Sequence, residues 1–171
     1  VPCVETSAID SMNYTMWINQ EWLDKLNLKA PTNNQELYDV LVAFRDKDPN
    51  GNGQKDEIPL FGRHKPGAAG WGGNLIDWLL NLFVYYNEAR NWKVEADGTL
   101  VPVYTQDEYR EALKFINKLY KDELLTSMVF TLGDGEIAPI ASPANGTALC
   151  GIICAHSTGA ARGSEVMYQY V

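Results

Sequence analysis

The segment DPNGNGQKDEIP, residues 48–59, constrains the fold of this chain more than any other stretch. It holds three carboxylates, two asparagines and two glycines within twelve positions. Gly51 and Gly53 permit a tight backbone, because glycine adopts left-handed conformations without steric cost. The segment therefore predicts a compact loop in which several side-chain oxygens face one another.

These oxygens match the preferences of calcium, a hard cation that takes six to eight oxygen ligands at about 2.3–2.6 Å. Alternate positions of the loop can point side chains inward, and its three carboxylates would repel one another without a counter-ion. We therefore expect a structural calcium ion that orders the loop. The expected ligands are Asp48, Asn50, Asn52, the main-chain carbonyl of Gln54, Asp56 and Glu57.

The spacing resembles the first part of an EF-hand, but it does not predict a calcium-triggered switch. The twelfth position, where an EF-hand has a bidentate glutamate, is Pro59, which has no ligating side chain. The next segment, residues 58–61, is strand-like rather than an exiting helix. The ion is expected to brace the fold, and a solvated Asn-Gly turn without metal is the alternative.

Hydrophobic periodicity predicts helices on both sides of the loop. Asn19 can cap a short helix over residues 20–27. Thr32 and Gln35 fit a capping box that opens an amphipathic helix running to about residue 46. Residues 74–86 are apolar nearly all round, which predicts a largely buried helix.

The second half of the chain combines strands and helices. Residues 92–104 predict a hairpin that turns at Asp97-Gly98. Thr105 and Glu108 form another capping box, and a final buried strand is expected within residues 126–154. The class is thus helix-rich α+β. The expected buried face of the long helix is Tyr109, Leu113, Ile116, Leu119 and Tyr120.

Charge and cysteine content exclude several functions. The formal charge is -8 and no basic cluster is longer than residues 63–65, so no nucleic-acid partner is expected. Cys3, Cys150 and Cys154 match neither a zinc ribbon nor a CxxC redox motif, and we interpret them as small apolar residues. No apolar run approaches the length of a membrane span, about 18 residues. The opening VPCVETS and the closing MYQYV predict a piece of a longer protein.

Residues 14–60 resemble the family 1 extracellular solute-binding proteins of bacterial ABC transporters, which include large oligosaccharide-binding lipoproteins. The motifs that carry the resemblance are the WLDKL helix at 22–26, Pro31-Thr32, and the run from Ala43 to Leu60 with its DPNGNG and DEIPL elements. A patchier match extends through residues 108–125 to VFT at 129–131. The chain departs from the family at KDELL, residues 121–125, where an EGL-like turn is usual.

The resemblance implies a two-lobed periplasmic-binding-protein type II fold with a hinge between the lobes and the ligand in the cleft. It also implies a structural calcium at the same six positions. Residues 1–171 would then form a single domain, most of one lobe. The implied partners are a small solute, oligosaccharide first, and an ABC permease. The whole protein would be extracytoplasmic and held at the cell surface by a lipid anchor that lies outside this sequence.

Sugar ligands need an aromatic face and fixed polar groups. Trp71 is flanked by glycines that leave it little local packing, so it is a candidate for ligand contact, with a core or interdomain role as the alternative. Glu5, Thr6 and Ser7, near the crossover implied by the resemblance, are further candidates. Trp17 and Trp78 lie in apolar stretches and are assigned to the core, and Arg63 with His64 is interpreted as solvated surface.

Catalysis is not expected, and no catalytic residue is assigned. His64 and His156 are the two histidines, and no GxSxG elbow, HExxH helix or Walker loop accompanies them. Asp56 and Glu57 are already accounted for by the metal. The alternatives are a calcium-stabilised cell-surface adhesion or scaffold module and, with less support, a carbohydrate-active enzyme domain with two carboxyls across a cleft.

Overall fold

The computed structural model describes residues 15–64, 74–86, 91–133, 136–141, 147–155 and 167–169. The strands of the main sheet are β1 (Thr15–Asn19), β2 (Ile58–Phe61), β5 (Cys150–Ala155) and β6 (Met167–Gln169). They are ordered β2-β5-β1-β6. β1 pairs antiparallel with both β5 and β6, whereas β2 pairs parallel with β5. β2 is therefore an edge strand of this sheet.

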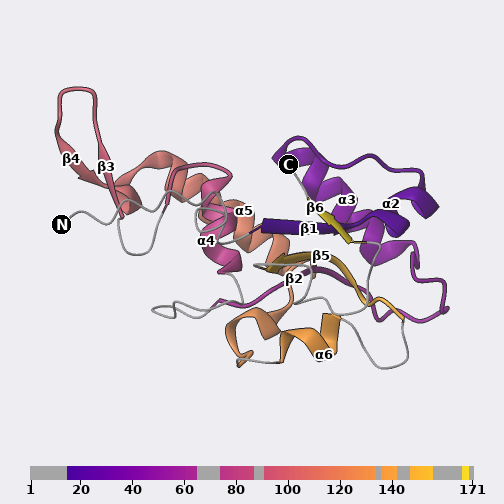
Figure 1. Cartoon of the computed structure of the whole chain (residues 1–171). Helices are drawn as coiled ribbons and strands as arrows, with labels where there is room; N and C mark the ends of the chain where they lie inside the picture. Colours follow the sequence, from indigo (N-terminus) through magenta and orange to yellow (C-terminus); the bar gives the residue numbers. More distant parts are fainter. Residues whose placement is uncertain are drawn as a thin grey trace, which may run out of the picture.

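Helices cover both faces of the sheet, which confirms the α+β class. Figure 1 shows α2 and α3 on one side of the strands and α6 on the other, with α4, α5 and the β3–β4 hairpin beyond one end. The helices are α2 (Gln20–Leu26), α3 (Asn34–Asp46), α4 (Leu75–Asn81), α5 (Asp107–Lys121) and α6 (Ile137–Ala141). The hairpin strands are β3 (Trp92–Val94) and β4 (Leu100–Pro102), and short 3-10 turns are η1 (Val103–Thr105) and η2 (Ser127–Phe130).

Successive side chains of a strand face opposite sides of the sheet, so the core is divided into two clusters. Met16 and Ile18 of β1 face the larger cluster, which includes Trp22 and Phe44 from the covering helices. The rings of Trp22 and Phe44 meet edge to face, with centroids 5.2 Å apart. Trp17, between them on β1, packs instead against the smaller cluster beside α6, so it belongs to the core as expected.

The N-cap predicted for α2 is confirmed, whereas the one predicted for α3 is wrong. Asn19 caps α2 as expected, accepting a hydrogen bond from the Trp22 amide at 3.1 Å. The capping box predicted at Thr32 and Gln35 is wrong by one residue. Asn33 caps α3, while the amide and hydroxyl of Thr32 both donate to Glu36 at 2.8 Å. These hydrogen bonds stabilise the Glu36 carboxylate and lower its pKa.

α4 is shorter than the predicted helix over 74–86, and it is not buried all round. The helix stops at Asn81, whose side chain bonds the backbone three times. Its amide donates to the carbonyls of Asp77 and Tyr86 at 2.8 Å each, and its oxygen accepts from the Tyr86 amide at 3.0 Å. These hydrogen bonds end the helix, because the amide side chain of asparagine competes with the helical main chain for hydrogen-bond partners.

The predicted start and buried face of α5 need correction. The Thr105 hydroxyl donates to the Pro102 carbonyl at 2.8 Å, and Gln106 stands at the cap position without a side-chain bond. Leu113 is 45% exposed and Tyr120 47% exposed, although both were assigned to the core. The face that is buried is rotated toward α4 and consists of Ala112, Ile116 and Leu119.

α5 ends in a strained turn at the KDELL segment. Glu123 has a left-handed backbone with φ of 57°, a conformation that glycine adopts without cost. The turn directs Leu124 and Leu125 into the core. α5 is tied to α3 there, since Asp122 accepts from the Tyr38 hydroxyl at 2.8 Å and its carbonyl accepts from Arg45.

The expected hairpin and final strand are both present. β3 and β4 pair antiparallel across a turn in which Gly98 has φ of 85°. Cys150 and Cys154 lie on β5 as buried free thiols, which confirms them as apolar residues of the core. Within the described segments, no helix has the length and apolar character needed to cross a bilayer.

Candidate functional site

The loop at 48–57 joins the end of α3 to the start of the edge strand β2. Asp48, Gly51 and Gly53 have left-handed backbones, with φ of 45°, 73° and 73°. The Gly51 amide donates to the Asp48 carbonyl at 3.1 Å, which closes the first turn. The compact loop predicted from the two glycines is therefore present.

Side-chain oxygens of the loop turn inward onto its own backbone. Asp48 accepts from the amides of Asn52 and Gly53 at 3.1 and 3.0 Å. Asn50 accepts from the Asn52 amide at 3.0 Å, and Asn52 accepts from the Gln54 amide at 2.7 Å. The expected alternation therefore gathers three side-chain oxygens within one short stretch.

Asp56 lies opposite these residues and receives their amide groups. The Nδ2 atom of Asn50 is 3.0 Å from Oδ1 of Asp56, and that of Asn52 is 3.1 and 3.0 Å from its two oxygens. The asparagine N–H groups thus satisfy the Asp56 oxygens by hydrogen bonds without neutralising their charge. Rotating either amide by half a turn would present its oxygen instead, since the two ends of the group have similar shape.

Glu57 is the carboxylate with the least favourable surroundings. Its Oε1 atom is buried and has no hydrogen-bond partner within the described part of the chain. Desolvation raises the pKa of Glu57, and the neighbouring Asp48 and Asp56 raise it further. A buried acceptor beside two other carboxylates costs free energy unless a cation or donor compensates it.

The donors fit a hard cation better than a transition metal. The unsatisfied Glu57 oxygen, the Asp48 and Asp56 carboxylates and two reorientable amides are all oxygen donors, the type calcium prefers. Over the residues described, no three His, Cys, Asp or Glu side chains are grouped to hold a metal. Any ion here would therefore depend on the asparagine oxygens and main-chain carbonyls as well as on the acids.

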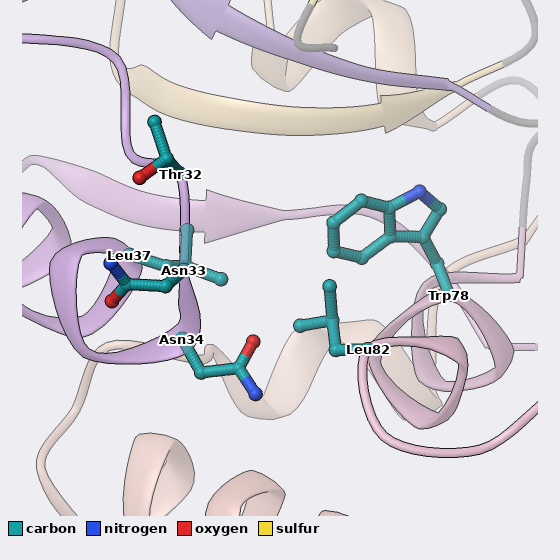
Figure 2. A pocket seen from close by; sticks show the side chains of 6 residues that line it. All are labelled: Thr32, Asn33, Asn34, Leu37, Trp78 and Leu82. Atoms are coloured by element: carbon teal, nitrogen blue, oxygen red, sulfur yellow. The ribbon is translucent and has the colours of Figure 1, made fainter.

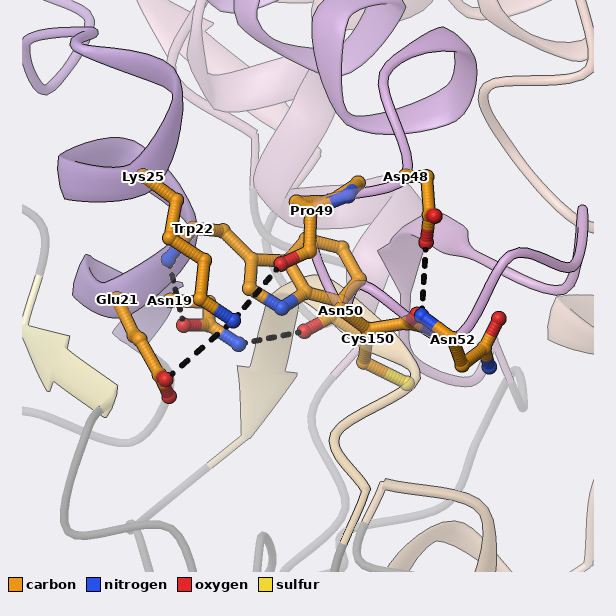
Figure 3. Close-up of polar contacts among 9 residues, drawn as sticks. All are labelled: Asn19, Glu21, Trp22, Lys25, Asp48, Pro49, Asn50, Asn52 and Cys150. Carbon is orange, nitrogen blue, oxygen red and sulfur yellow. Dashed lines mark hydrogen bonds and ion pairs between the residues drawn. The ribbon is translucent and has the colours of Figure 1, made fainter.

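Lys25 of α2 fastens the loop to the rest of the domain. Its ammonium group donates to the carbonyl of Pro49 at 3.1 Å and lies 3.5 Å from Glu21 (Figure 3). The nearby Asn19 side chain donates to the Cys150 carbonyl at 3.5 Å, linking α2 to β5. Lys25 thus connects the loop to α2, and Asn19 connects the start of α2 to β5.

A pocket of about 340 Å³ lies between the start of α3 and the end of α4 (Figure 2). Trp78 and Leu82, one helical turn apart, form one side of it. Trp78 packs against the larger core cluster as expected, but it is only half-buried and also lines the pocket. The remaining lining residues come from α3 and the segment just before it: Thr32, Asn33, Asn34 and Leu37.

The sequence alone did not identify this pocket. Its two walls are separated by about 40 residues of chain, and hydrophobic periodicity cannot tell a buried tryptophan from one that lines a cavity. The polar pair Asn33-Asn34 at a helix start was the available signal, but one of its members serves as the cap.

The other ligand candidates have different outcomes. Glu5, Thr6, Ser7 and Trp71 lie outside the described residues. Arg63, assigned to solvated surface, is buried with 4% exposure at the end of β2, so that assignment is wrong. His64 is half-buried, with its ring nitrogen against the Asn74 side chain.

The sequence is similar to substrate-binding proteins of transporters. It is 35% identical over 123 residues to FusA, a fructooligosaccharide ABC transporter substrate-binding protein of Streptococcus pneumoniae, a match covering 72% of this chain and 22% of FusA. It is 35% identical over 116 residues to the lipoprotein LipO of Bacillus subtilis, covering 68% and 22%. No family model matches the chain.

Solved structures agree with the sequence comparison. The structure of FusA with kestose superimposes with a TM-score of 0.76 at 28% identity, covering 92% of this chain and 30% of that one. This chain is a relative of the solute-binding proteins of ABC transporters. An HMO-binding relative from Bifidobacterium longum infantis gives a TM-score of 0.77 at 28% identity, covering 92% and 33%. The fold of this chain accordingly corresponds to one part of the two-lobed solute-binding proteins.

The extent of the match bears on function. The chain spans about 22% of the length of the curated relatives FusA and LipO. These relatives are named as binding proteins or lipoproteins rather than enzymes. A FusA variant described as an EF-hand mutant, solved with fructo-nystose, also superimposes, with a TM-score of 0.75 at 27% identity over 95% of this chain and 31% of that one.

Proposed function

We propose that this chain is most of one lobe of an extracytoplasmic oligosaccharide-binding protein that delivers its ligand to an ABC permease. The observation that carries the proposal is the agreement with kestose-bound FusA, with a TM-score of 0.76 over 92% of this chain. Because shared fold alone does not fix function, the sequence identity of 35% with the same protein adds independent support.

In this proposal residues 1–171 form a single domain and supply one wall of the ligand cleft. The second lobe supplies the other wall, and the two close around the sugar by a hinge motion. The protein binds its ligand and does not alter it chemically. The name of LipO supports a lipid anchor that holds the full-length protein at the cell surface.

The loop at 48–57 is proposed to hold one structural calcium ion. Asp48, Asn50, Asn52, Asp56 and Glu57 would bind through their side chains and Gln54 through its carbonyl. Such an ion would supply positive charge to the three carboxylates, relieve the unsatisfied Glu57 oxygen and keep the connection from α3 to β2 in one conformation. Calcium at 1,000 times its dissociation constant would add about 4 kcal/mol to the stability of the fold.

The ligand proposal is tested on the full-length protein by isothermal titration calorimetry with kestose, maltotriose and xylotriose in millimolar calcium. Saturable binding of at least one neutral trisaccharide, without release of smaller sugars on prolonged incubation, is expected. Absence of binding to all three would contradict the oligosaccharide assignment. Appearance of cleaved sugar in a chromatogram would contradict the assignment as a binding protein.

A further inference from the structure

The pocket between α3 and α4 has an uncharged lining in a strongly charged protein. The chain carries 14 Lys and Arg and 22 Asp and Glu, yet none is among the six residues that line the pocket. A charged ligand would enter without an opposite charge to receive it, which is unfavourable because its desolvation is not compensated. The lining therefore selects a neutral ligand.

One side of the pocket is an apolar surface of the type that accepts a sugar ring. Figure 2 shows the indole of Trp78 and the side chain of Leu82 facing the start of α3. Both side chains are half-buried, so each is held by the core on one side and exposed to the pocket on the other. An indole face held in this way offers a large, rigid contact area for an apolar ring face.

The opposite side carries polar groups with unused hydrogen-bonding capacity. The Asn34 amide points toward Leu82 and forms no side-chain hydrogen bond within the described segments. The Thr32 hydroxyl donates to Glu36 at 2.8 Å, which leaves its oxygen available as an acceptor. The Asn34 amide, which faces the side formed by Trp78 and Leu82, matches a ligand that has an apolar ring face and hydroxyls at its edge.

We propose that this pocket binds a sugar residue of a neutral oligosaccharide, with Trp78 against the ring face and Asn34 hydrogen-bonded to its hydroxyls. The proposal rests on the proposed function, that the full-length protein binds oligosaccharides. It adds a contact site formed within this domain alone. The cavity volume of about 340 Å³ lies at the lower end of the range for small-molecule sites, roughly 300–1,000 Å³, which suits one sugar residue better than a chain.

The test compares Trp78→Leu and Asn34→Ala with wild type in the full-length protein. Affinity is measured by calorimetry for whichever of kestose, maltotriose and xylotriose the wild type binds, and melting temperature is measured alongside. Trp92→Leu is the matched control, because Trp92 is 52% exposed on the hairpin, away from the pocket. Asn34→Ala keeps the assay informative should Trp78→Leu fail to fold, since alanine is well tolerated in the first turn of a helix.

Both pocket variants are expected to lose affinity roughly tenfold or more, with the control unchanged. If the wild type binds a trisaccharide and folded Asn34→Ala binds it within twofold of wild type, the pocket assignment is overturned while the proposed function stands. A lower melting temperature with unchanged affinity would likewise overturn it, and would show that Trp78 contributes to packing of the core rather than to ligand binding. No trisaccharide binding by wild type would overturn both proposals.

Discussion

Phe44 of α3 lies directly against the backbone of Gly151 on β5. A Cβ atom at Gly151 would stand 2.3 Å from Cδ2 of Phe44 and 2.9 Å from the carbonyl oxygen of Pro59. Neither neighbour can move away without a large cost in free energy, because Phe44 is fully buried and the Pro59 oxygen belongs to the backbone. The helix that precedes the loop at 48–57 therefore packs on the sheet through a position that must lack a side chain.

Gly151→Ala is expected to lower the free energy of unfolding by about 2–3 kcal/mol, the range for overpacking a closed core. Chemical denaturation of the chain measures this loss. The companion variant Gly98→Ala tests a different effect, since its Cβ would meet nothing within 4 Å but its φ of 85° is left-handed. It should cost only about 1 kcal/mol. Equal losses in the two variants would contradict the close approach at Gly151.

Asp48→Ala is expected to abolish most of the calcium-dependent stabilisation of the domain. The change removes one proposed ligand and also the acceptor for the Asn52 and Gly53 amides. Melting temperatures are compared in EGTA and in millimolar calcium, with metal analysis of the untreated protein. The wild type should gain several degrees, as about 4 kcal/mol of linkage implies for a domain of this size.

Asp97→Ala is the control for that experiment, because Asp97 accepts from the Thr99 amide at 2.9 Å in the hairpin turn. It should lower the melting temperature equally with and without calcium. An Asp48→Ala protein that kept the full calcium response would refute the assigned ligand set. If calcium does not change the melting temperature of the wild type, the loop is a simple turn and the proposed metal site is wrong.

Glu57→Gln should have opposite effects in the two buffers. In EGTA the variant is expected to be more stable than wild type, because it removes a buried charge beside Asp48 and Asp56. In calcium it should be less stable, because an amide binds the ion more weakly than a carboxylate. The same thermal scans measure both effects, and loss of stability in both buffers would argue against a metal at this position.

Glu123→Gly is expected to stabilise the domain by about 1 kcal/mol, because a non-glycine residue pays a steric cost at φ of 57°. Glu123 is exposed and its side chain forms no described contact that the change would remove. Lys121→Gly, in the last turn of α5, should instead destabilise by about 1 kcal/mol. Opposite signs in urea denaturation are the expected result, and a loss for Glu123→Gly would mean that the turn needs its side chain.

The two thiols of β5 should be inert in the folded protein. Burial raises the pKa of Cys154 to about 12 and that of Cys150 further still. A raised pKa disfavours the thiolate, so the fold loses stability as pH rises above the ordinary thiol value of about 8.5. Mass spectrometry of a Cys3→Ser variant with a thiol reagent at pH 8 should show labelling only after unfolding. Rapid labelling of the native variant would contradict the buried placement.

The regular elements followed largely from the sequence. The apolar spacing around Phe44 predicted α3 to its last residue, and the position of β2 followed from its short apolar run. The helix ends that depend on competition between side-chain hydrogen bonds could not be predicted from the sequence. Thr32 bonds Glu36 and leaves the cap to Asn33, and Asn81 ends α4 early. Neither competition is visible in a hydrophobic pattern.

The candidate sites differ in the same way. The loop at 48–57 is local in sequence, so spacing alone indicated a compact turn in which Asp48, Asn50 and Asn52 bond its backbone, while the set of six metal ligands stays a prediction. The pocket beside Trp78 arises where α3 meets α4, and its shape depends on how the two helices pack. The orientation of the Asn50 and Asn52 amides toward Asp56 also required coordinates, because composition does not specify which end of an amide faces a neighbour.

The strand order has a consequence for how the domain is made. β5 lies between β2 and β1, and Thr15 pairs with Ala155 while Ile58 pairs with Cys150. The two earlier strands therefore cannot complete their pairing until the segment around residue 150 reaches them. Such distant pairing slows folding, since a long chain must close before its contacts form. β1 gains its second neighbour later still, when β6 at residues 167–169 pairs with it, so both strands keep apolar edges exposed until the last part of this chain is in place.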